Sequence, residues 1–126
     1  MSKKTIKNLP QTELEVMQVV WELSAPVPRA VLEEEVYKIH PMAQTTLLTL
    51  VSRLVKKDFL KAEKNGRSSE YTPLVSKDEY IAMESKSFIQ RVCGGSVSVF
   101  ASGLIDSGIS KEDLKELRAL LEKDEL

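Results

Sequence analysis

The sequence contains few of the residues from which active sites and disulfide frameworks are built. Among its 126 residues there is one cysteine, Cys93, and one histidine, His40. A single cysteine cannot form an internal disulfide and offers no CxxC spacing for a metal, so we expect a reducing compartment. The sequence shows no carboxylate pair, glycine-rich phosphate loop or metal-ligand cluster, and His40 has no partners for a catalytic triad. We therefore expect no enzyme, no cofactor and no metal site.

Long apolar runs are lacking as well. No stretch approaches the about 18 to 20 apolar residues that a membrane span needs, and the first ten residues, MSKKTIKNLP, are polar and basic, unlike a secretory signal. The last four residues, KDEL, match a retention address of the endoplasmic reticulum, but that address acts only on chains that enter the secretory route. We interpret the match as coincidence and expect a cytoplasmic protein without membrane insertion.

Charge is unevenly distributed along the chain, although the net charge is only −1 and the pI about 5.9. Residues 1–75 carry 11 basic and 9 acidic side chains, a net +2, whereas residues 76–126 carry 7 and 10, a net −3. Six basic residues lie close together between positions 53 and 67: Arg53, Lys56, Lys57, Lys61, Lys64 and Arg67. Because a phosphate backbone responds to local positive charge, the acidic pI does not exclude a nucleic-acid partner.

Apolar residues recur at helical spacing in three segments of the first 57 residues. We expect helices over residues 10–23, 29–39 and 43–57, with Pro10 in the first turn of the first helix. We also expect a short strand at Val27 and a helix stop at His40-Pro41, since the residue before proline disfavours helical geometry. The residues expected to face the core are Leu14, Met17, Val20 and Trp21, then Val31, Leu32 and Val36, then Leu47, Leu50, Val51 and Leu54. We expect Trp21 to be a core anchor rather than a binding platform.

A β-hairpin is predicted next. Residues 59–64 and 69–74 flank Asn65-Gly66-Arg67, and Asn-Gly is a strong signal for a tight turn because both residues tolerate positive φ. The order helix, short strand, helix, helix, hairpin is that of a winged helix-turn-helix domain. In such a domain the third helix fits the major groove of double-stranded DNA, and the hairpin wing reaches flanking phosphates.

The candidate DNA-binding residues lie on the polar side of the third helix and on the wing. Three hydroxyl residues on that side, Thr45, Thr49 and Ser52, argue against a merely solvated face, because threonine is a poor helix former whereas hydroxyls contact phosphates and base edges well. The candidates are Thr45, Thr46, Thr49, Ser52, Arg53, Lys56, Lys64 and Arg67. A solvated surface is the alternative interpretation of the helix face taken alone.

The last 51 residues predict helices with apolar stripes. Ser76 and Glu79 form a capping-box pattern that opens a helix to about Cys93, which Gly94-Gly95 ends. An apolar segment over residues 96–105 and a final helix opened by Ser110 and Asp113 follow. So short a segment cannot bury these stripes alone, so we expect a two-fold homodimer. The candidate dimerisation residues are Phe88, Ile89, Leu104, Leu114, Leu117, Leu120 and Leu121. We expect Cys93 to be a buried small residue near the dimer seam.

The predicted fold class is mainly α with a small β wing. Residues 1–75 form the winged helix-turn-helix DNA-binding domain, and residues 76–126 form a helical dimerisation domain.

Several stretches, taken in order, resemble the penicillinase repressor family (the BlaI/MecI/CopY type) over about residues 9–122. They are Glu13-Leu14-Glu15-Val16-Met17 with Trp21, then Thr46, Thr49, Leu50, Arg53, Leu54, Lys56 and Lys57, then Glu70-Tyr71-Thr72-Pro73-Leu74-Val75, then Phe88 with Gly94-Gly95, and finally Glu116-Leu117-Arg118 with Leu120-Leu121. The resemblance implies a winged-helix repressor dimer that silences genes for resistance or stress responses.

The sequence departs from the family pattern at two places. The family's recognition helix often reads Lys-Thr-x-Arg-Thr, whereas Thr45 and Leu48 occupy the two basic positions here, so the family's operator sequence does not carry over. Members that answer penicillins are cut by a membrane-bound sensor protease at an Asn-Phe pair. Ser102 and Gly103 stand at those positions here, which marks them as the place of proteolytic inactivation without giving the signal.

We therefore predict a transcriptional repressor that binds a pseudo-palindromic operator in double-stranded DNA as a homodimer. A protein-interaction module without DNA binding is the alternative, because fold alone does not fix function. The acidic pI and the missing recognition arginine favour that alternative modestly.

Overall fold

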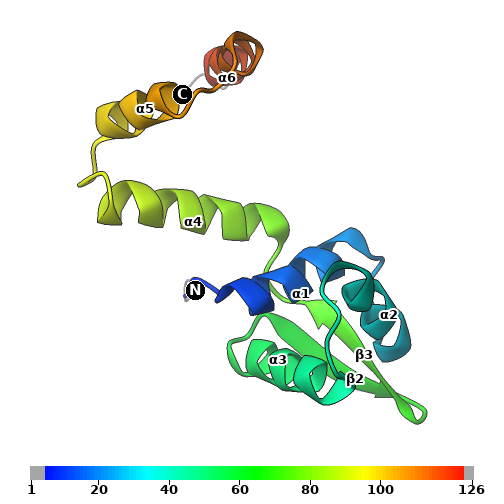
Figure 1. The fold of residues 1–126 in the computed structure, drawn as a ribbon. Coiled ribbons are helices and arrows are strands. Elements are labelled where there is room, and N and C mark those ends of the chain that lie inside the picture. Colours follow the sequence, from blue (N-terminus) through cyan, green and yellow to red (C-terminus); the bar gives the residue numbers. More distant parts are fainter. Residues whose placement is uncertain (1–4, 124–126) are drawn as a thin grey trace. The chain divides into compact units, whose positions relative to one another are not determined.

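The computed structural model describes residues 5–123, which form helices and one three-stranded antiparallel sheet (Figure 1). Residues 1–4 and the last three residues of the KDEL sequence lie outside the described range. The chain divides into two compact units, Met1–Glu84 and Ser85–Leu126, and the division falls within helix α4 (Lys77–Arg91).

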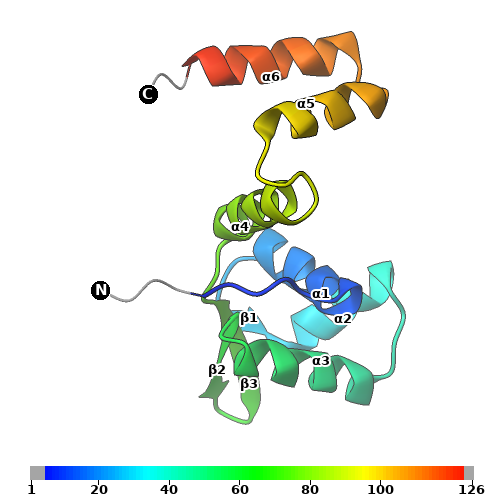
Figure 2. The same ribbon diagram turned by 90° about the vertical axis from the view of Figure 1, so that its left-hand side faces the viewer.

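The first unit has the predicted order of elements. It contains α1 (Gln11–Glu22), β1 (Val27–Pro28), α2 (Arg29–Ile39), α3 (Gln44–Lys56), β2 (Leu60–Asn65) and β3 (Ser68–Pro73), followed by the start of α4. The sheet order is β1-β3-β2, so β3 pairs with both neighbours and β2 forms an edge. In Figure 2 the three helices lie on one side of this small sheet. The fold class is confirmed: a mainly helical chain with a winged helix-turn-helix in its first unit.

One hydrophobic core holds the first unit together, and it draws on every helix and strand of the domain. Its fully buried members include Met17 of α1, Leu32 of α2, Leu54 of α3 and Phe59, which precedes β2. Val31 was predicted to face this core, but the prediction is wrong: its side chain is 39% exposed. It lies about 100° around α2 from the fully buried Leu32, which places it outside the buried side of the helix.

Trp21 anchors the core to the segment that follows the sheet. Its indole Nε1 donates a hydrogen bond to the Val75 carbonyl at 2.9 Å, and its ring lies 5.7 Å from that of Tyr80. The Tyr80 hydroxyl accepts a hydrogen bond from the Leu9 N–H and donates to Glu84. Burial raises the pKa of Tyr80 above its ordinary value; the bond from Leu9 opposes this shift, and Glu84 adds to it.

The hairpin is confirmed, but its turn differs in detail from the prediction. Asn65 pairs with Ser68 as the last rung of the ladder, so the two turn residues are Gly66 and Arg67. Within the hairpin turn Gly66 alone has a positive φ, at 66°, and Asn65 stays in the strand. A glycine at the first of two central residues gives a turn whose twist matches the strands, and it leaves Arg67 at the tip of the wing.

The end of α3 lies where it was predicted, but the conformation that ends the helix was not predicted. Asp58 has a φ of 63°, and among the described residues it is the one non-glycine in that region. The Phe59 N–H bonds to the Leu54 carbonyl and the Asp58 N–H to the Val55 carbonyl, which is the Schellman pattern. Glycine usually fills the position that Asp58 holds, because a side chain there is strained.

We expect Asp58→Gly to raise the free energy of unfolding of the first unit by up to about 1 kcal/mol, because it removes the left-handed strain. Denaturant unfolding followed by the fluorescence of Trp21, the single tryptophan, measures this directly. Asp58→Ala is the control: it removes the same carboxylate but keeps a Cβ, so it should bring no gain. Equal stabilisation by both variants would contradict the backbone explanation.

The second unit consists of the rest of α4, α5 (Val97–Asp106) and α6 (Lys111–Lys123). The Ser76–Glu79 capping box at the start of α4 is confirmed: the Glu79 N–H donates to Ser76 Oγ at 3.0 Å, and the Ser76 N–H to Glu79 Oε1 at 2.9 Å. Gly94 and Gly95 end α4 with φ values of 61° and 82°. The apolar segment 96–105 is largely helical.

Candidate nucleic-acid interface

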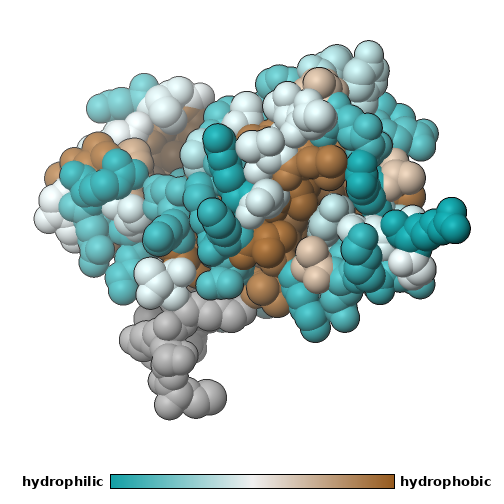
Figure 3. Space-filling view, turned by 90° about the horizontal axis from the view of Figure 1, so that it is seen from below, coloured by the Kyte–Doolittle hydropathy of each residue, from teal (hydrophilic) through white to brown (hydrophobic). Residues whose placement is uncertain are grey.

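Helix α3 separates a buried apolar side from an exposed polar side. Leu47, Leu50, Val51 and Leu54 are at most 5% exposed, as predicted. The six candidate DNA-binding residues of this helix are all exposed: Thr45, Thr46, Thr49, Ser52, Arg53 and Lys56. Because α3 contains no acidic residue, the polar groups of this exposed side are hydroxyls, positive charges and the amide of Gln44. Figure 3 views the molecule from below, the side on which α3 and the hairpin lie in Figure 1; hydrophilic surface dominates, with hydrophobic surface exposed among it.

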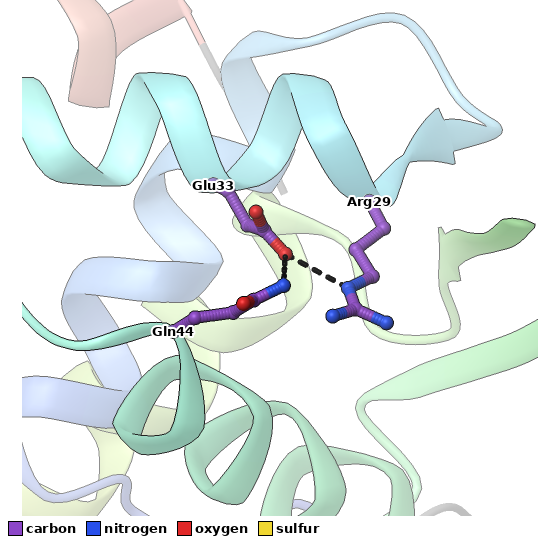
Figure 4. A network of polar contacts seen from close by, with 3 residues as sticks. All are labelled: Arg29, Glu33 and Gln44. Carbon is purple, nitrogen blue, oxygen red and sulfur yellow. Dashed lines mark hydrogen bonds and ion pairs between the residues drawn. The ribbon is translucent and has the colours of Figure 1, made fainter.

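A polar network joins α2 to the first residue of α3 (Figure 4). Glu33 Oε1 accepts hydrogen bonds from Arg29 Nε at 2.8 Å and from Gln44 Nε2 at 3.1 Å. The Arg29 hydrogen bond, partly opposed by desolvation, is the main reason why the pKa of Glu33 lies below its ordinary value. No side chain caps the start of α3 at Ala43, so the Gln44–Glu33 contact ties this end of the helix to α2.

The other end of α3 is held by a buried ion pair. Lys57 Nζ lies 2.6 Å from Glu13 Oε1 of α1, and the Glu13 side chain is only 3% exposed. Sequence reasoning missed this pair, because a glutamate in the first turn of an amphipathic helix is an ordinary surface residue. The two residues are 44 positions apart, so no local spacing could reveal the contact. Lys57 is therefore part of the scaffold, unlike the neighbouring Arg53 and Lys56.

Alternation along the wing sorts its lysines onto two faces. Leu60 is buried, so Ala62 and Lys64 share its face of β2, whereas Lys61 and Glu63 point the other way. Lys61 Nζ lies 3.5 Å from Glu63 Oε1, so its charge is locally balanced. Lys64 and Arg67 are exposed, and within residues 5–123 neither forms an ion pair.

Arg53 and Lys56 of α3 are likewise exposed, and neither forms an ion pair within the described part of the chain. Four cations on α3 and the wing thus remain available to a ligand. The charge of an unpaired, exposed cation is not balanced by a neighbouring carboxylate, so the cation can replace the counterions of a phosphate.

The candidate dimerisation residues keep much of their surface in the single chain. Phe88, Leu120 and Leu121 are 42%, 58% and 68% exposed. Ile89, Leu104, Leu114 and Leu117 are half-buried. Between residues 85 and 123 Cys93 is the one buried side chain, at 8% exposed, in agreement with its predicted burial.

Ser102 and Gly103, the candidate proteolytic site, lie inside α5 and are both exposed. His40, for which the sequence suggests no role, ends α2, and its Nδ1 lies 2.8 Å from Glu15 Oε2 of α1. No group of three potential metal ligands occurs in residues 5–123. No helix in that range is long and apolar enough to cross a membrane.

Comparison with known proteins decides the family. The model of the penicillinase repressor family matches residues 9–123. The chain belongs to the penicillinase repressor family. The Bacillus licheniformis penicillinase repressor is 32% identical over 95% of this chain and 94% of its own length. A methicillin resistance regulatory protein, MecI of Mammaliicoccus sciuri, is 27% identical over 98% of this chain and 99% of its own length.

Solved structures of family members support the winged-helix assignment. The DNA-binding domain of the repressor BlaI in solution is 33% identical, with a TM-score of 0.55 over 62% of this chain and 94% of that domain. The monomeric form of Bacillus licheniformis BlaI in complex with the blaP half-operator gives a TM-score of 0.53 over the same shares. The predicted family is thus confirmed, and this is a family of repressors rather than of enzymes.

Proposed function

We propose that this protein is a transcriptional repressor that binds a pseudo-palindromic operator in double-stranded DNA as a homodimer and controls resistance or stress-response genes. The observation that carries the proposal is the exposed, acid-free side of α3 beside a wing with unpaired cations, in a chain of the penicillinase repressor family. A related repressor has been solved with a half-operator, which supports DNA as the ligand of this surface.

Each part of the surface has its own role in this proposal. The first turns of α3, with Thr45, Thr46 and Thr49, enter the major groove and contact base edges. Ser52, Arg53 and Lys56 follow on the same helix and contact phosphates, as do Lys64 and Arg67 of the wing. Phosphate contacts position the protein and carry no sequence information, whereas contacts to base edges specify the operator.

Dimerisation by residues 76–126 is supported by the exposed apolar surface of the second unit. Ile105, Leu120 and Leu121 are each more than half exposed, and Leu114 and Leu117 line an open groove with Ile105. Apolar side chains left in water by one chain are stabilised by burial against the same segment of another. A two-fold dimer with one recognition helix per subunit requires two half-sites about 34 Å apart or a small multiple of that distance.

Membership of the family also motivates proteolytic inactivation at Ser102–Gly103 by a membrane-bound sensor protease. Both residues are exposed, which supports access. They lie within a regular helix, so cleavage requires α5 to open locally.

Retention on random-sequence duplex DNA at several salt concentrations tests the proposed function. A DNA-binding repressor is retained at low salt and released steeply as salt rises, because bound phosphates release counterions. An absence of retention at low salt would refute the proposal and favour a protein-interaction module. Footprinting on a selected operator should then show two half-sites, and a single asymmetric half-site at saturation would refute the two-fold dimer.

We expect Arg67→Ala and Thr49→Ala to weaken operator binding in different ways. Arg67→Ala should weaken binding to operator and random duplex alike and flatten the salt dependence by about one unit of slope for each phosphate that is no longer neutralised, so two for a dimer. Thr49→Ala should lower operator affinity by about 1 kcal/mol and leave the slope nearly unchanged. Titrations of both variants on both duplexes at several salt concentrations separate these outcomes.

Lys61→Ala is the matched control for Arg67→Ala, since Lys61 is balanced by Glu63 on the other face of the wing. It should change affinity and slope less than Arg67→Ala does. If Arg67→Ala destroys the ratio of operator to random affinity while Thr49→Ala preserves it, the wing and not α3 occupies the groove.

A further inference from the structure

An apolar side chain borders the exposed side of α3. Leu48 is half-buried, yet it is neither a member of the core nor one of the hydrophobic side chains packed against it, whereas Val55 of the same helix does pack there. Of its neighbours three and four residues away on the helix surface, Gln44, Thr45 and Ser52 are exposed, and Val51 belongs to the core. The core therefore does not explain why a leucine stands here.

Two of the hydrogen-bond donors beside Leu48, those of Gln44 and Thr49, are already engaged. Gln44 Nε2 donates to Glu33 Oε1 (Figure 4), so this amide is held against α2. Thr49 Oγ1 donates to the Thr45 carbonyl at 3.0 Å, so its hydroxyl hydrogen is used within the helix. Residues 44–52 contain no arginine, lysine or asparagine. The side chains that read guanine or adenine by paired hydrogen bonds are thus missing or occupied.

Besides the hydroxyls of Thr45, Thr46 and Ser52, this stretch presents methyl groups. Leu48 carries two at its tip, and the exposed Thr45 and Thr49 carry one each. In the major groove thymine is the base that displays an apolar group, its C5 methyl. Burial of two methyl surfaces against each other is favourable without any hydrogen bond.

We propose that Leu48 is a specificity-determining residue that reads thymine through its C5 methyl group, with Thr45 and Thr49 completing the apolar contact. The proposal rests on the proposed function, because it takes α3 to be the helix in the groove. Discrimination then comes from the absence of this apolar contact at every other base, and one thymine in each half-site is contacted by Leu48.

Replacement of thymine by uracil tests the proposal, because uracil differs from thymine only in lacking the methyl group. The probe is a duplex recovered by the full chain from a randomised library, with each thymine of a half-site changed in turn to deoxyuridine. At the contacted position we expect binding to weaken about fourfold, the equivalent of about 0.8 kcal/mol for one buried methyl. The same change in both half-sites should weaken it about fifteenfold.

The Leu48→Ala variant assigns the effect to this residue. It should lose the sensitivity to uracil at one position of each half-site, whereas Leu48→Met, which keeps an apolar side chain of similar volume, should retain it. The thermal midpoint reported by Trp21 fluorescence establishes that Leu48→Ala is folded.

Tolerance of uracil at every position by the natural protein would overturn the proposal, as would equal sensitivity in Leu48→Ala and the natural protein. Failure to recover any duplex bound more tightly than random DNA is a different result. It would refute the proposed function, and this inference with it.

Discussion

Lys57→Met is expected to lower the free energy of unfolding of the first unit by about 3 kcal/mol, because it leaves the Glu13 carboxylate buried without a partner. Glu13 is 2% exposed, and its one hydrogen-bonded ion-pair partner in the described structure is Lys57, at 2.6 Å. Removal of one member of such a pair costs roughly 3 to 5 kcal/mol. We take the lower end because the Lys57 side chain is 28% exposed and water can reach part of the site.

The measurement is denaturant unfolding followed by Trp21, which reports on the first unit through its contacts with Val75 and Tyr80. Lys61→Met is the matched control: it removes an exposed lysine from the wing and should change stability by less than about 0.5 kcal/mol. The double variant Glu13→Leu/Lys57→Met should recover most of the loss, because an apolar pair of similar volume replaces a buried ion pair without penalty. A loss in Lys57→Met no larger than in Lys61→Met would contradict the structural role of the pair.

This ion pair shows why the sequence predicts some features of the fold and not others. The stripes of α3 and the Ser76–Glu79 capping box depend on spacings of three and four residues, so the sequence alone predicts them correctly. Glu13 and Lys57 meet only after α1 packs against α3, and the left-handed conformation of Asp58 depends on how the chain turns from α3 into β2. Such features follow from tertiary packing and have no local signature.

In the candidate interface, too, some features follow from local spacing and others from tertiary packing. Exposure of Thr45, Thr49 and Arg53 follows from helical periodicity, and so could be predicted. That the Gln44 amide and the Thr49 hydroxyl are engaged depends on atomic contacts, one of them with α2, and this changes what α3 can offer a base edge. Leu48 stands out in the sequence only as a departure from a family pattern. Its lack of contact with the core makes it a candidate for base recognition.

The second large effect is expected at the proposed dimer interface. Leu117→Asp should raise the dissociation constant of the homodimer at least about a hundredfold, because a carboxylate buried in an interface without a partner costs roughly 3 kcal/mol or more. Leu117 lies at the centre of the apolar stripe of α6, with Leu114 one turn before it and Leu121 one turn after, and all three line the groove that Ile105 borders. Sedimentation at a concentration where the natural protein is dimeric measures the change.

Operator binding should follow the loss of the dimer. Two linked recognition helices bind the second half-site at a high effective concentration, so a monomer should lose about 10²-fold or more in affinity for the full operator. Its affinity for an isolated half-site should stay close to that of the natural protein, because Leu117 lies in the second unit and α3 in the first. Lys115→Asp is the matched control, since it places the same carboxylate on the opposite side of α6, where Lys115 is exposed. If Leu117→Asp stays dimeric, or if Lys115→Asp dissociates as readily, the leucine stripe of α6 is not the interface.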